Sequence, residues 1–510
     1  MLDLLTTHPI LTLLTLLTFP TIYLLINIRL ETQRISRLGT FAPRVPSPLP
    51  FGISIFIRSI TASRNNTDYA FWSYLFSHCP YPHSKTVETH LARQRFIFTA
   101  DPENIKAVLA TQFADYGKGE PFHEEWKWFL GDSIFTTDGE LWHASRQLLR
   151  PQFVKTRVAD LEIFEHHILK LMAQIPPQGG EVDISALFYR FTLDSATDYL
   201  LGKSVDSLTN PDTKFATAFA EVQQVQNEMS RAGPFQKILP KGKFWRGLRV
   251  INDFVEPFID SALALNPADL KEKTGQSFLH ALAATGTRER KVIRDQVVAV
   301  LLAGRDTTAG ALSFTFQELA GNRKIFERLR REILETVGEQ RVPTYEDLKS
   351  MTYLQRVMNE TLRLYPSVPF NVRMSLHDTT LPTGGGPDGM QPIGILKDTP
   401  IAYSTLYMQR REDLVPSPSA DFPPVLTYCP ERWENWTPKP WTYIPFNGGP
   451  RICIGQQFAL TEMSYTIVRI LQRFDRIEKY WQEGTQGLRS EIVLSPTNGV
   501  KVGFWEAKSE

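Results

Sequence analysis

The sequence predicts a mainly helical protein with small β-sheets, preceded by one hydrophobic N-terminal helix that is long enough to cross a membrane. Three observations lead to this prediction. Residues 10–28 contain no charged side chain, and this is about the length that a hydrocarbon core requires. Most segments between residues 102 and 370 repeat apolar side chains with helical spacing. Segments 86–99 and 375–403 carry instead the β-branched residues and turns of short strands.

Composition narrows the class of protein. Of the 510 residues, 42% are hydrophobic and 22% are charged, which are ordinary proportions for a globular protein with a large core. The net charge of +1 gives no electrostatic footprint for nucleic acid, so no nucleic-acid partner is expected. Three cysteines are too few for a disulfide framework in a chain of this length, which favours a reducing compartment.

The hydrophobic N-terminal stretch is interpreted as a membrane anchor over residues 1–29. A cleaved signal peptide is the alternative, but its basic leading region is missing, because Asp3 is the only ionisable side chain before His8. The positive-inside tendency places the N-terminus in the lumen and the rest of the chain in the cytosol, with membrane lipid as a partner. Four basic residues support this orientation: Arg29, Arg34, Arg37 and Arg44.

A basic and proline-rich segment follows the anchor. Four prolines fall between Pro43 and Pro50, and such a stretch is typical of a semi-rigid extended spacer. After residue 53 neither a composition break nor an internal repeat separates further domains. We therefore expect a linker over residues 30–52 and a single domain over residues 53–510.

Local signals place several elements within that domain. Asp101 and Pro102 are typical of a helix start, and residues 294–321 are predicted to form one unusually long helix. Residues 384–389 match the Gly-x-Gly-x-x-Gly pattern of dinucleotide sites, but Pro387 opposes the helix that such a site needs. We interpret this segment as a loop between strands. No flavin or nicotinamide site is expected, so any electrons must come from another protein.

The strongest functional signal surrounds Cys453. Residues 446–455 read Phe-Asn-Gly-Gly-Pro-Arg-Ile-Cys-Ile-Gly and precede a predicted helix. Glycines let the backbone approach a flat cofactor closely, and Arg451 supplies a positive charge. The exposed N–H groups and the positive end of the helix dipole favour a thiolate at this position. These features meet the requirements of a haem iron held by one cysteine sulfur. The alternative is an inert cysteine in a loop.

Two predicted helices carry charged or polar residues in unusual places. Glu360 and Arg363 stand three residues apart on one face of an apolar helix, where a buried ion pair needs partners with good geometry. A solvated surface pair is the alternative. The long helix contains Ala-Gly-Arg-Asp-Thr-Thr at residues 303–308. These are poor choices for a helix interior, and a threonine hydroxyl there competes for backbone bonds. The alternative is a bent amphipathic helix with one polar stripe.

Together these motifs resemble those of the cytochrome P450 family. The pattern Phe-x-x-Gly-x-Arg-x-Cys-x-Gly, from Phe446 to Gly455, is similar to the haem-binding signature of the family. The resemblance covers nearly the whole chain. It implies the cytochrome P450 fold for residues 53–510 and a haem b cofactor whose iron takes its axial thiolate from Cys453.

The resemblance also implies roles for residues away from the cysteine. Asp306 and Thr307 would be catalytic, with Thr307 holding a water or dioxygen by hydrogen bonding and Asp306 feeding protons inward. A structural triad would fix the cysteine loop and haem incorporation: Glu360, Arg363 and Arg432. The remaining cofactor-binding residues would be Phe446, Gly455 and four that satisfy the haem propionates, namely Trp142, Arg146, Arg373 and Arg451.

The implied activity is that of a monooxygenase. It inserts one atom of dioxygen into a hydrophobic substrate and releases the other as water, with electrons from NADPH through NADPH-cytochrome P450 reductase. The implied location is the endoplasmic reticulum membrane, with one span and a cytosolic catalytic domain. A basic run is a candidate docking face for the reductase, although a solvated face explains it equally well: Arg146, Arg150, Lys155 and Arg157.

Segments 149–153, 303–310 and 455–462 are most similar in wording to fungal members that hydroxylate alkanes and fatty acids. A long-chain alkane or fatty acid is therefore the first expectation for the substrate. The alternative is a tailoring oxidase that acts on a polyketide or terpenoid skeleton in secondary metabolism. A haem-thiolate isomerase is less favoured because such relatives usually lack the acid–threonine pair. A non-catalytic haem sensor is less favoured because of the membrane anchor and the basic face.

Overall fold

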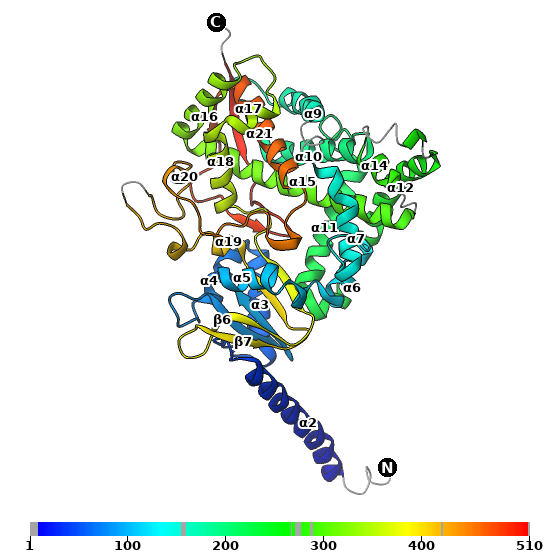
Figure 1. The fold of residues 1–510 in the computed structure, drawn as a ribbon, viewed down its shortest axis with the longest axis vertical. Coiled ribbons are helices and arrows are strands. Elements are labelled where there is room, and N and C mark those ends of the chain that lie inside the picture. Colours follow the sequence, from blue (N-terminus) through cyan, green and yellow to red (C-terminus); the bar gives the residue numbers. More distant parts are fainter. Residues whose placement is uncertain are drawn as a thin grey trace.

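The computed structural model describes residues 9–154, 160–266, 268–270, 277–285, 289–419 and 422–507. Helices make up most of this part of the chain and surround one long central helix, α15 (Arg290–Gly321) (Figure 1). A smaller β-rich region lies at the end of the molecule from which the N-terminal helix extends. The mainly helical fold with small sheets is therefore confirmed.

The N-terminal helix α2 (Pro9–Leu38) projects from the body as a rod (Figure 1). It contains the segment predicted to cross a membrane, and apolar side chains in its described part face outward, with Phe19 73% and Tyr23 67% exposed. The helix continues past the expected anchor boundary at residue 29, because neither glycine nor proline occurs between that residue and Gly39. The first part of the expected linker is therefore helical.

The rest of the expected linker packs against the β-rich region and does not run free. The Thr40 N–H donates to Pro392 O at 2.8 Å, and the Val45 N–H donates to Glu88 O at 2.9 Å. Val45 is also buried, with 1% exposure. The prolines of this segment thus stiffen a strap that is held to the domain. Two helices and a short turn follow it: η1 (Pro50–Gly52), α3 (Ile53–Arg64) and α4 (Asp68–Phe76).

The helical region is assembled around α15. α10 packs along it, and α18 and α21 contact it from other sides. The predicted helix at residues 294–321 is confirmed and begins four residues earlier. The other helices are α5 (Pro102–Lys106), α6 (Gly119–Leu130), α7 (Gly139–Leu149), α9 (Glu162–Ala173), α10 (Ile184–Leu201), α11 (Lys214–Ala232), α12 (Gly242–Ala264), α14 (Phe278–Ala284), α16 (Arg323–Thr336), α17 (Tyr345–Ser350), α18 (Thr352–Leu364), α19 (Thr405–Met408), α20 (Arg432–Asn435) and α21 (Gln456–Arg473).

Within the described residues, α15 is the helix that has the length and hydropathy of a membrane span. Most of its apolar stretch, 78%, is buried inside the protein. Its hydrophobic character is explained by this central position, because a helix that contacts neighbours all round buries apolar side chains on every face.

The largest sheet has five strands in the order β1-β2-β8-β5-β3, in which β2 and β8 pair in parallel and the other pairs are antiparallel. The strands predicted in segments 86–99 and 375–403 are confirmed, and residues 384–389 form the end of β6 and the turn that leads to β7. The strands are β1 (Thr86–Leu91), β2 (Gln94–Thr99), β3 (Tyr116–Gly117), β4 (Val182–Asp183), β5 (Asn371–Ser375), β6 (Thr379–Gly385), β7 (Gln391–Ile395), β8 (Pro400–Tyr403), β9 (Phe474–Lys479), β10 (Leu488–Ser490), β11 (Leu494–Pro496) and β12 (Lys501–Glu506).

Candidate active site

One cavity of about 270 Å³ lies where α15, α21 and the loop before α21 meet. Apolar side chains form most of its wall, and cations gather at one part of it. Segments that are far apart in the sequence contribute to it, because α7, α15 and β5 all reach the same space. Of the residues predicted for the site, the cavity brings together Trp142, Arg146, Thr307, Arg373, Phe446, Arg451, Cys453 and Gly455.

The cysteine loop is shaped by backbone contacts. The Cys453 N–H donates to Phe446 O at 2.9 Å and closes the loop on itself. Gly449 has φ +66°, and a Cβ added there would lie 1.9 Å from Leu109 O. This turn therefore requires glycine. The loop ends at α21, whose first residue is Gln456, so Cys453 lies just before a helix N-terminus as predicted.

Cys453 is exposed to a cavity that the protein itself encloses. This enclosure raises the pKa of the thiol, while the Gly455 N–H and the Arg146 guanidinium lower it. A metal ion at the sulfur would favour the thiolate further, since the anionic form is the metal ligand.

Cations concentrate beside the cysteine. The Arg451 guanidinium donates to Asp138 Oδ1 at 2.5 Å, and the Arg373 guanidinium donates to Asn371 Oδ1 at 2.8 Å. Burial and the neighbouring Arg373 lower the pKa of Arg451 to about 10. Lys118 also lines the cavity, and burial together with Arg373 and Arg451 holds its pKa well below the ordinary value. Burial is the larger cause of both shifts and the neighbouring cations add to it, while Asp138 is the carboxylate that opposes them. Positive charges thus exceed the counter-ions around this part of the cavity.

The excess charge fits a ligand with two carboxylates. Arg451 Nε is buried without a partner in the described structure, and buried donors normally have one. Haem b carries two propionates and would supply acceptors at this point. Lys118 would join the predicted arginines in holding them. The sequence did not reveal Lys118, because no motif surrounds it and only the tertiary fold brings it beside Arg373.

Two glycines also fit a flat ligand in the cavity. A Cβ added at Gly455 would meet its nearest atom, on Phe153, at 3.7 Å, and one added at Gly304 would meet Ala196 at 3.9 Å. These are ordinary contacts, so packing within the protein does not require glycine at either position. Both residues line the cavity. Their missing side chains leave room for a cofactor or substrate, and the residues present fit a haem.

The central helix gives the two predicted catalytic residues different surroundings. Thr307 lines the cavity, and its hydroxyl donates to Ala303 O at 2.7 Å. Asp306 is not part of the cavity wall. Its carboxylate accepts a hydrogen bond from Gln223 on α11. Successive side chains of a helix point about 100° apart, so the structure places the acid and the hydroxyl on different faces of α15.

The predicted triad is assembled away from the cavity. The Arg363 guanidinium donates to both oxygens of Glu360 at 2.8 Å, and Arg432 Nε donates to Glu360 Oε1 at 3.4 Å. All three residues have exposures of 1% or less. Trp433 Nε1 also donates to Glu360 at 3.0 Å. The carboxylate is therefore fully paired, as a buried charge requires.

A residue that the sequence did not reveal connects this triad to the cysteine loop. Gln409 is buried, and its amide donates to Leu362 O at 2.9 Å on the triad helix. Its carbonyl accepts from the Ile444 N–H at 2.9 Å, at the entry to the cysteine loop. The Arg363 guanidinium also donates to Gln409 O at 3.3 Å. The triad thus acts on the loop through hydrogen bonds that Gln409 relays.

A second buried acid lies behind the cavity wall. Glu462 on α21 has 1% exposure and accepts a hydrogen bond from Ser195 Oγ on α10 at 2.6 Å. Burial raises the pKa of its carboxyl to about 8, although the Ser195 and Thr308 hydroxyls lower it in part. Glu462 connects α10 and α21 at the point where α15 carries its threonine pair. In the sequence, the one sign that Glu462 is buried is its position on an otherwise apolar helix.

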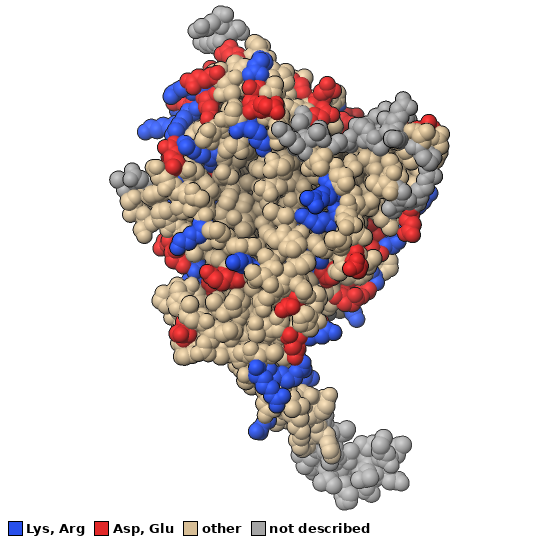
Figure 2. All heavy atoms as spheres, in the orientation of Figure 1, with Lys and Arg blue, Asp and Glu red and all other residues tan. Residues whose placement is uncertain are grey.

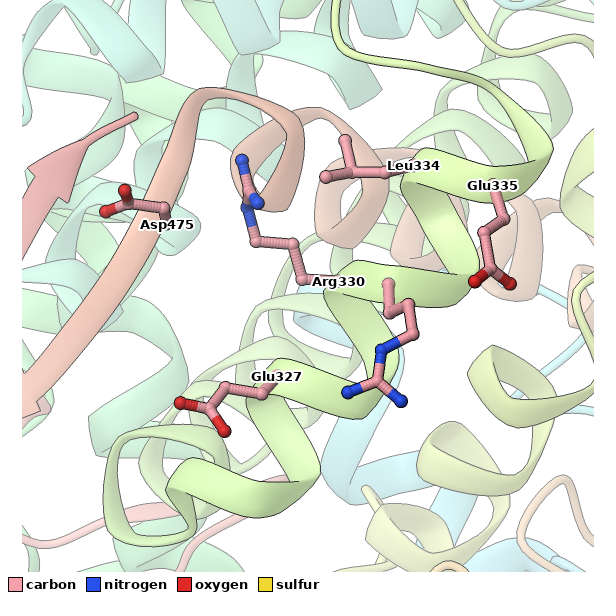
Figure 3. A pocket seen from close by; sticks show the side chains of 6 residues that line it. Glu327, Arg330, Leu334, Glu335 and Asp475 are labelled. Atoms are coloured by element: carbon pink, nitrogen blue, oxygen red, sulfur yellow. The ribbon is translucent and has the colours of Figure 1, made fainter. Parts of the chain in front are cut away.

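A separate hollow of about 470 Å³ opens between α16 and β9 (Figure 3). Acidic and basic side chains line this hollow. Asp475 is one of them, the others lie on α16, and no cysteine is present. It does not match the requirements of a haem-thiolate site. Of the basic run proposed for reductase docking, Arg146 and Arg150 are described, whereas Lys155 and Arg157 lie outside the described residues.

Comparison with known proteins gives a consistent result. The family model "Cytochrome P450" matches residues 48–502. The chain is 48% identical over 502 residues to "Cytochrome P450 monooxygenase pvhE" of Talaromyces variabilis, with 94% of this chain and 92% of the relative covered. It is 43% identical over 446 residues to "Cytochrome P450 52A1" of Candida tropicalis, with 83% and 81% covered.

The fold has solved counterparts as well. The crystal structure of the cytochrome P450DA heme domain superimposes with a TM-score of 0.74 at 20% identity, and covers 92% of this chain and 98% of that one. The family match, the extent of the relatives and a cavity that contains Cys453 all agree with the resemblance read from the motifs. The chain therefore belongs to the cytochrome P450 family and is a haem-thiolate monooxygenase.

Proposed function

We propose that this monooxygenase hydroxylates a long-chain alkane or fatty acid, with electrons from NADPH delivered by NADPH-cytochrome P450 reductase. The observation that carries the proposal is one enclosed cavity in which Cys453 and Thr307 share a mostly apolar wall. Residues such as Leu200, Val300 and Val368 form that wall. An aliphatic chain is favoured there because burial of apolar surface contributes roughly 25 cal/mol per Å².

Haem b, when bound with Cys453 as the thiolate ligand, supplies the chemistry of dioxygen activation. Lys118, Arg146, Arg373 and Arg451 hold its propionates, while Trp142, Phe446 and Gly455 shape the rest of its site. Glu360, Arg363 and Arg432 keep the cysteine loop in place. These roles are inferred from charge, burial and position around the cavity.

Thr307 and Asp306 have different roles in proton transfer. The Thr307 hydroxyl faces the cavity, where it holds a water or dioxygen and presents a proton to the reacting oxygen. In the resting structure this hydrogen is donated to Ala303 O at 2.7 Å, so the hydroxyl must turn away from that carbonyl before it presents the proton. Asp306 is 7% exposed and carries protons from the solvent side toward Thr307. A carboxylate that turns toward the hydroxyl is a suitable relay, because the carboxylate takes up and releases a proton and the hydroxyl passes one on as it receives another.

We also infer that residues 1–29 anchor the protein in the endoplasmic reticulum membrane, with the domain at residues 53–510 in the cytosol. Exposed apolar residues on α2 support the anchor. Basic side chains gather where α2 meets the body (Figure 2), and Arg29, Arg34 and Arg37 belong to this part of the helix. This arrangement agrees with the positive-inside tendency. Residues 30–52 join the anchor to the domain, first as the end of α2 and then, from Thr40, as a segment packed against the sheet region.

The substrate class is tested by a spectral binding screen with full-length holoenzyme. The ligands are n-alkanes, fatty acids and terpenoids of matched carbon number, followed by turnover with reductase and NADPH. The expected result is a spin-state shift and hydroxylated product with the linear ligands. Turnover of a cyclic terpenoid alone would replace this proposal with the tailoring-oxidase alternative. Product formation without reductase and NADPH would indicate an isomerase.

A further inference from the structure

The carboxylate of Asp306 is held by a neighbouring helix. Gln223 on α11 donates its amide N–H to Asp306 Oδ2. The carbonyl of the same amide accepts from Arg305 Nη1 at 3.2 Å, and Arg305 Nη1 lies 3.4 Å from Asp306 Oδ1. The three side chains form a closed ring in which the amide of Gln223 contacts both charged partners.

This ring is buried. The side chains of Arg305 and Asp306 are 11% and 10% exposed. The Arg305 guanidinium also lies over the ring of Phe219 on α11, 5.6 Å from its centroid. Hydrogen bonds to charged groups in such surroundings are among the stronger ones in proteins. The ring therefore fixes Asp306 on the face of α15 that looks toward α11 and away from the cavity wall.

We propose that Gln223 is a positioning residue that holds Asp306 in a resting orientation and must release it before protons pass to Thr307. This inference rests on the proposed relay role of Asp306. The amide gives the carboxylate a partner while it is turned away from the cavity, and the partner is lost when the side chain turns inward. Proton delivery then depends on the position of α11 relative to α15, because that position decides whether Gln223 can reach Asp306.

The contacts of α11 explain how its position can affect proton delivery by Asp306. In the part of the chain that the structure describes, the hydrogen bonds between α11 and α15 are the two that Gln223 makes. The apolar face of α11, including Val222, packs in the same core as the cavity-wall residues Ala196 and Leu200. A ligand that displaces this wall acts on α11 through the packing of this shared core. The ligand changes the equilibrium between the bonded and the released Asp306 only to the extent that it binds one position of α11 more tightly than the other.

The test compares Gln223→Leu with Gln224→Leu in full-length holoenzyme, reductase and NADPH, with hexadecanoic acid as the probe. Gln224 is exposed and bonds to Glu228 at 3.2 Å on its own helix, so it is the matched control. Loss of an amide bond to a carboxylate shifts the balance between the two orientations by about tenfold. Gln223→Leu should therefore lower the solvent deuterium isotope effect on NADPH consumption and the peroxide released per NADPH. Gln224→Leu should change neither.

The variant Asp306→Asn separates the two levels of the inference. In that background Gln223→Leu should add nothing, because the group that it releases no longer carries a proton. If Asp306→Asn impairs coupling while Gln223→Leu matches the native enzyme, the positioning role is wrong and the relay stands. If Asp306→Asn leaves both the solvent isotope effect and the coupling unchanged, the relay role of Asp306 and the positioning role of Gln223 are both wrong. A retained Soret shift with carbon monoxide shows in each variant that the haem site is intact.

Discussion

At the scale of single residues, the sulfur of Cys453 is the atom on which the assigned chemistry depends. Cys453→Ala removes the proposed axial ligand and should abolish monooxygenase activity. The reduced protein with carbon monoxide should also lose the strong red shift of the Soret band that an anionic sulfur ligand produces. Cys79→Ala is the matched control, since the Cys79 thiol makes a weak contact with Tyr81 O at 3.9 Å far from the cavity. A normal spectrum from Cys453→Ala would refute the ligand assignment.

Thr307 lines the cavity and carries the hydroxyl that we propose as the proton donor. Thr307→Ala should leave haem binding intact but lower the product formed per NADPH by about tenfold, because a positioned proton donor contributes at least that much. Peroxide release should rise in parallel. Thr307→Ser keeps a hydroxyl at the same place and should retain most of the coupling. Equal coupling in Thr307→Ala and the native enzyme would contradict the assigned role.

Glu462 makes stability depend on pH. Its carboxyl has a pKa of about 8 in the folded protein, against an ordinary value of 4.5. The folded state therefore binds more protons than the unfolded state between these values, and stability falls as pH rises from about 4.5 to about 8.

Glu462→Gln should remove this dependence while keeping an amide that bonds to Ser195. The variant should gain roughly 2–5 kcal/mol relative to the native enzyme between pH 5 and pH 8, as follows from the size of the pKa shift. Urea unfolding of both proteins across this range measures the difference. A constant difference at all pH values would show that Glu462 does not titrate on unfolding.

At the scale of elements, the triad joins α18 and α20 and supports the cysteine loop through Gln409. Arg432→Ala leaves the buried Glu360 with one cation fewer and should destabilise the protein by about 3–5 kcal/mol. Haem content should fall with it. The control is Arg473→Ala, which breaks an exposed pair with Glu506 and should cost about 0–1 kcal/mol. Similar melting temperatures for the two variants would contradict a structural role of the triad.

At the scale of the whole molecule, two N-terminal truncations should have different effects, because only the second removes residues that pack against the domain. Removal of residues 1–29 should release the protein from phospholipid vesicles in a flotation assay and leave the carbon monoxide spectrum unchanged. Removal of residues 1–52 also deletes Val45 and its contacts with the sheet region. Burial of one such side chain stabilises by roughly 1.5–3 kcal/mol, so this truncation should melt earlier. Vesicle binding by both truncations would refute the proposed anchor.

The sequence by itself determined the helical class, the order of the main elements, the members of the buried triad and the cysteine that we propose as the iron ligand. These features are local, since spacing along a helix or around a cysteine is readable within about ten residues. The end of α2 at Leu38 and the packed linker differ from expectation, because composition reports neither the reach of a helix nor what a proline-rich segment packs against. Only the tertiary structure brought Lys118 into the cation cluster, Gln409 under the loop and Gln223 onto Asp306. Gln223 and Asp306, for instance, are 83 positions apart in the chain. Such pairs depend on how whole helices pack, and a single sequence carries no local signal for them.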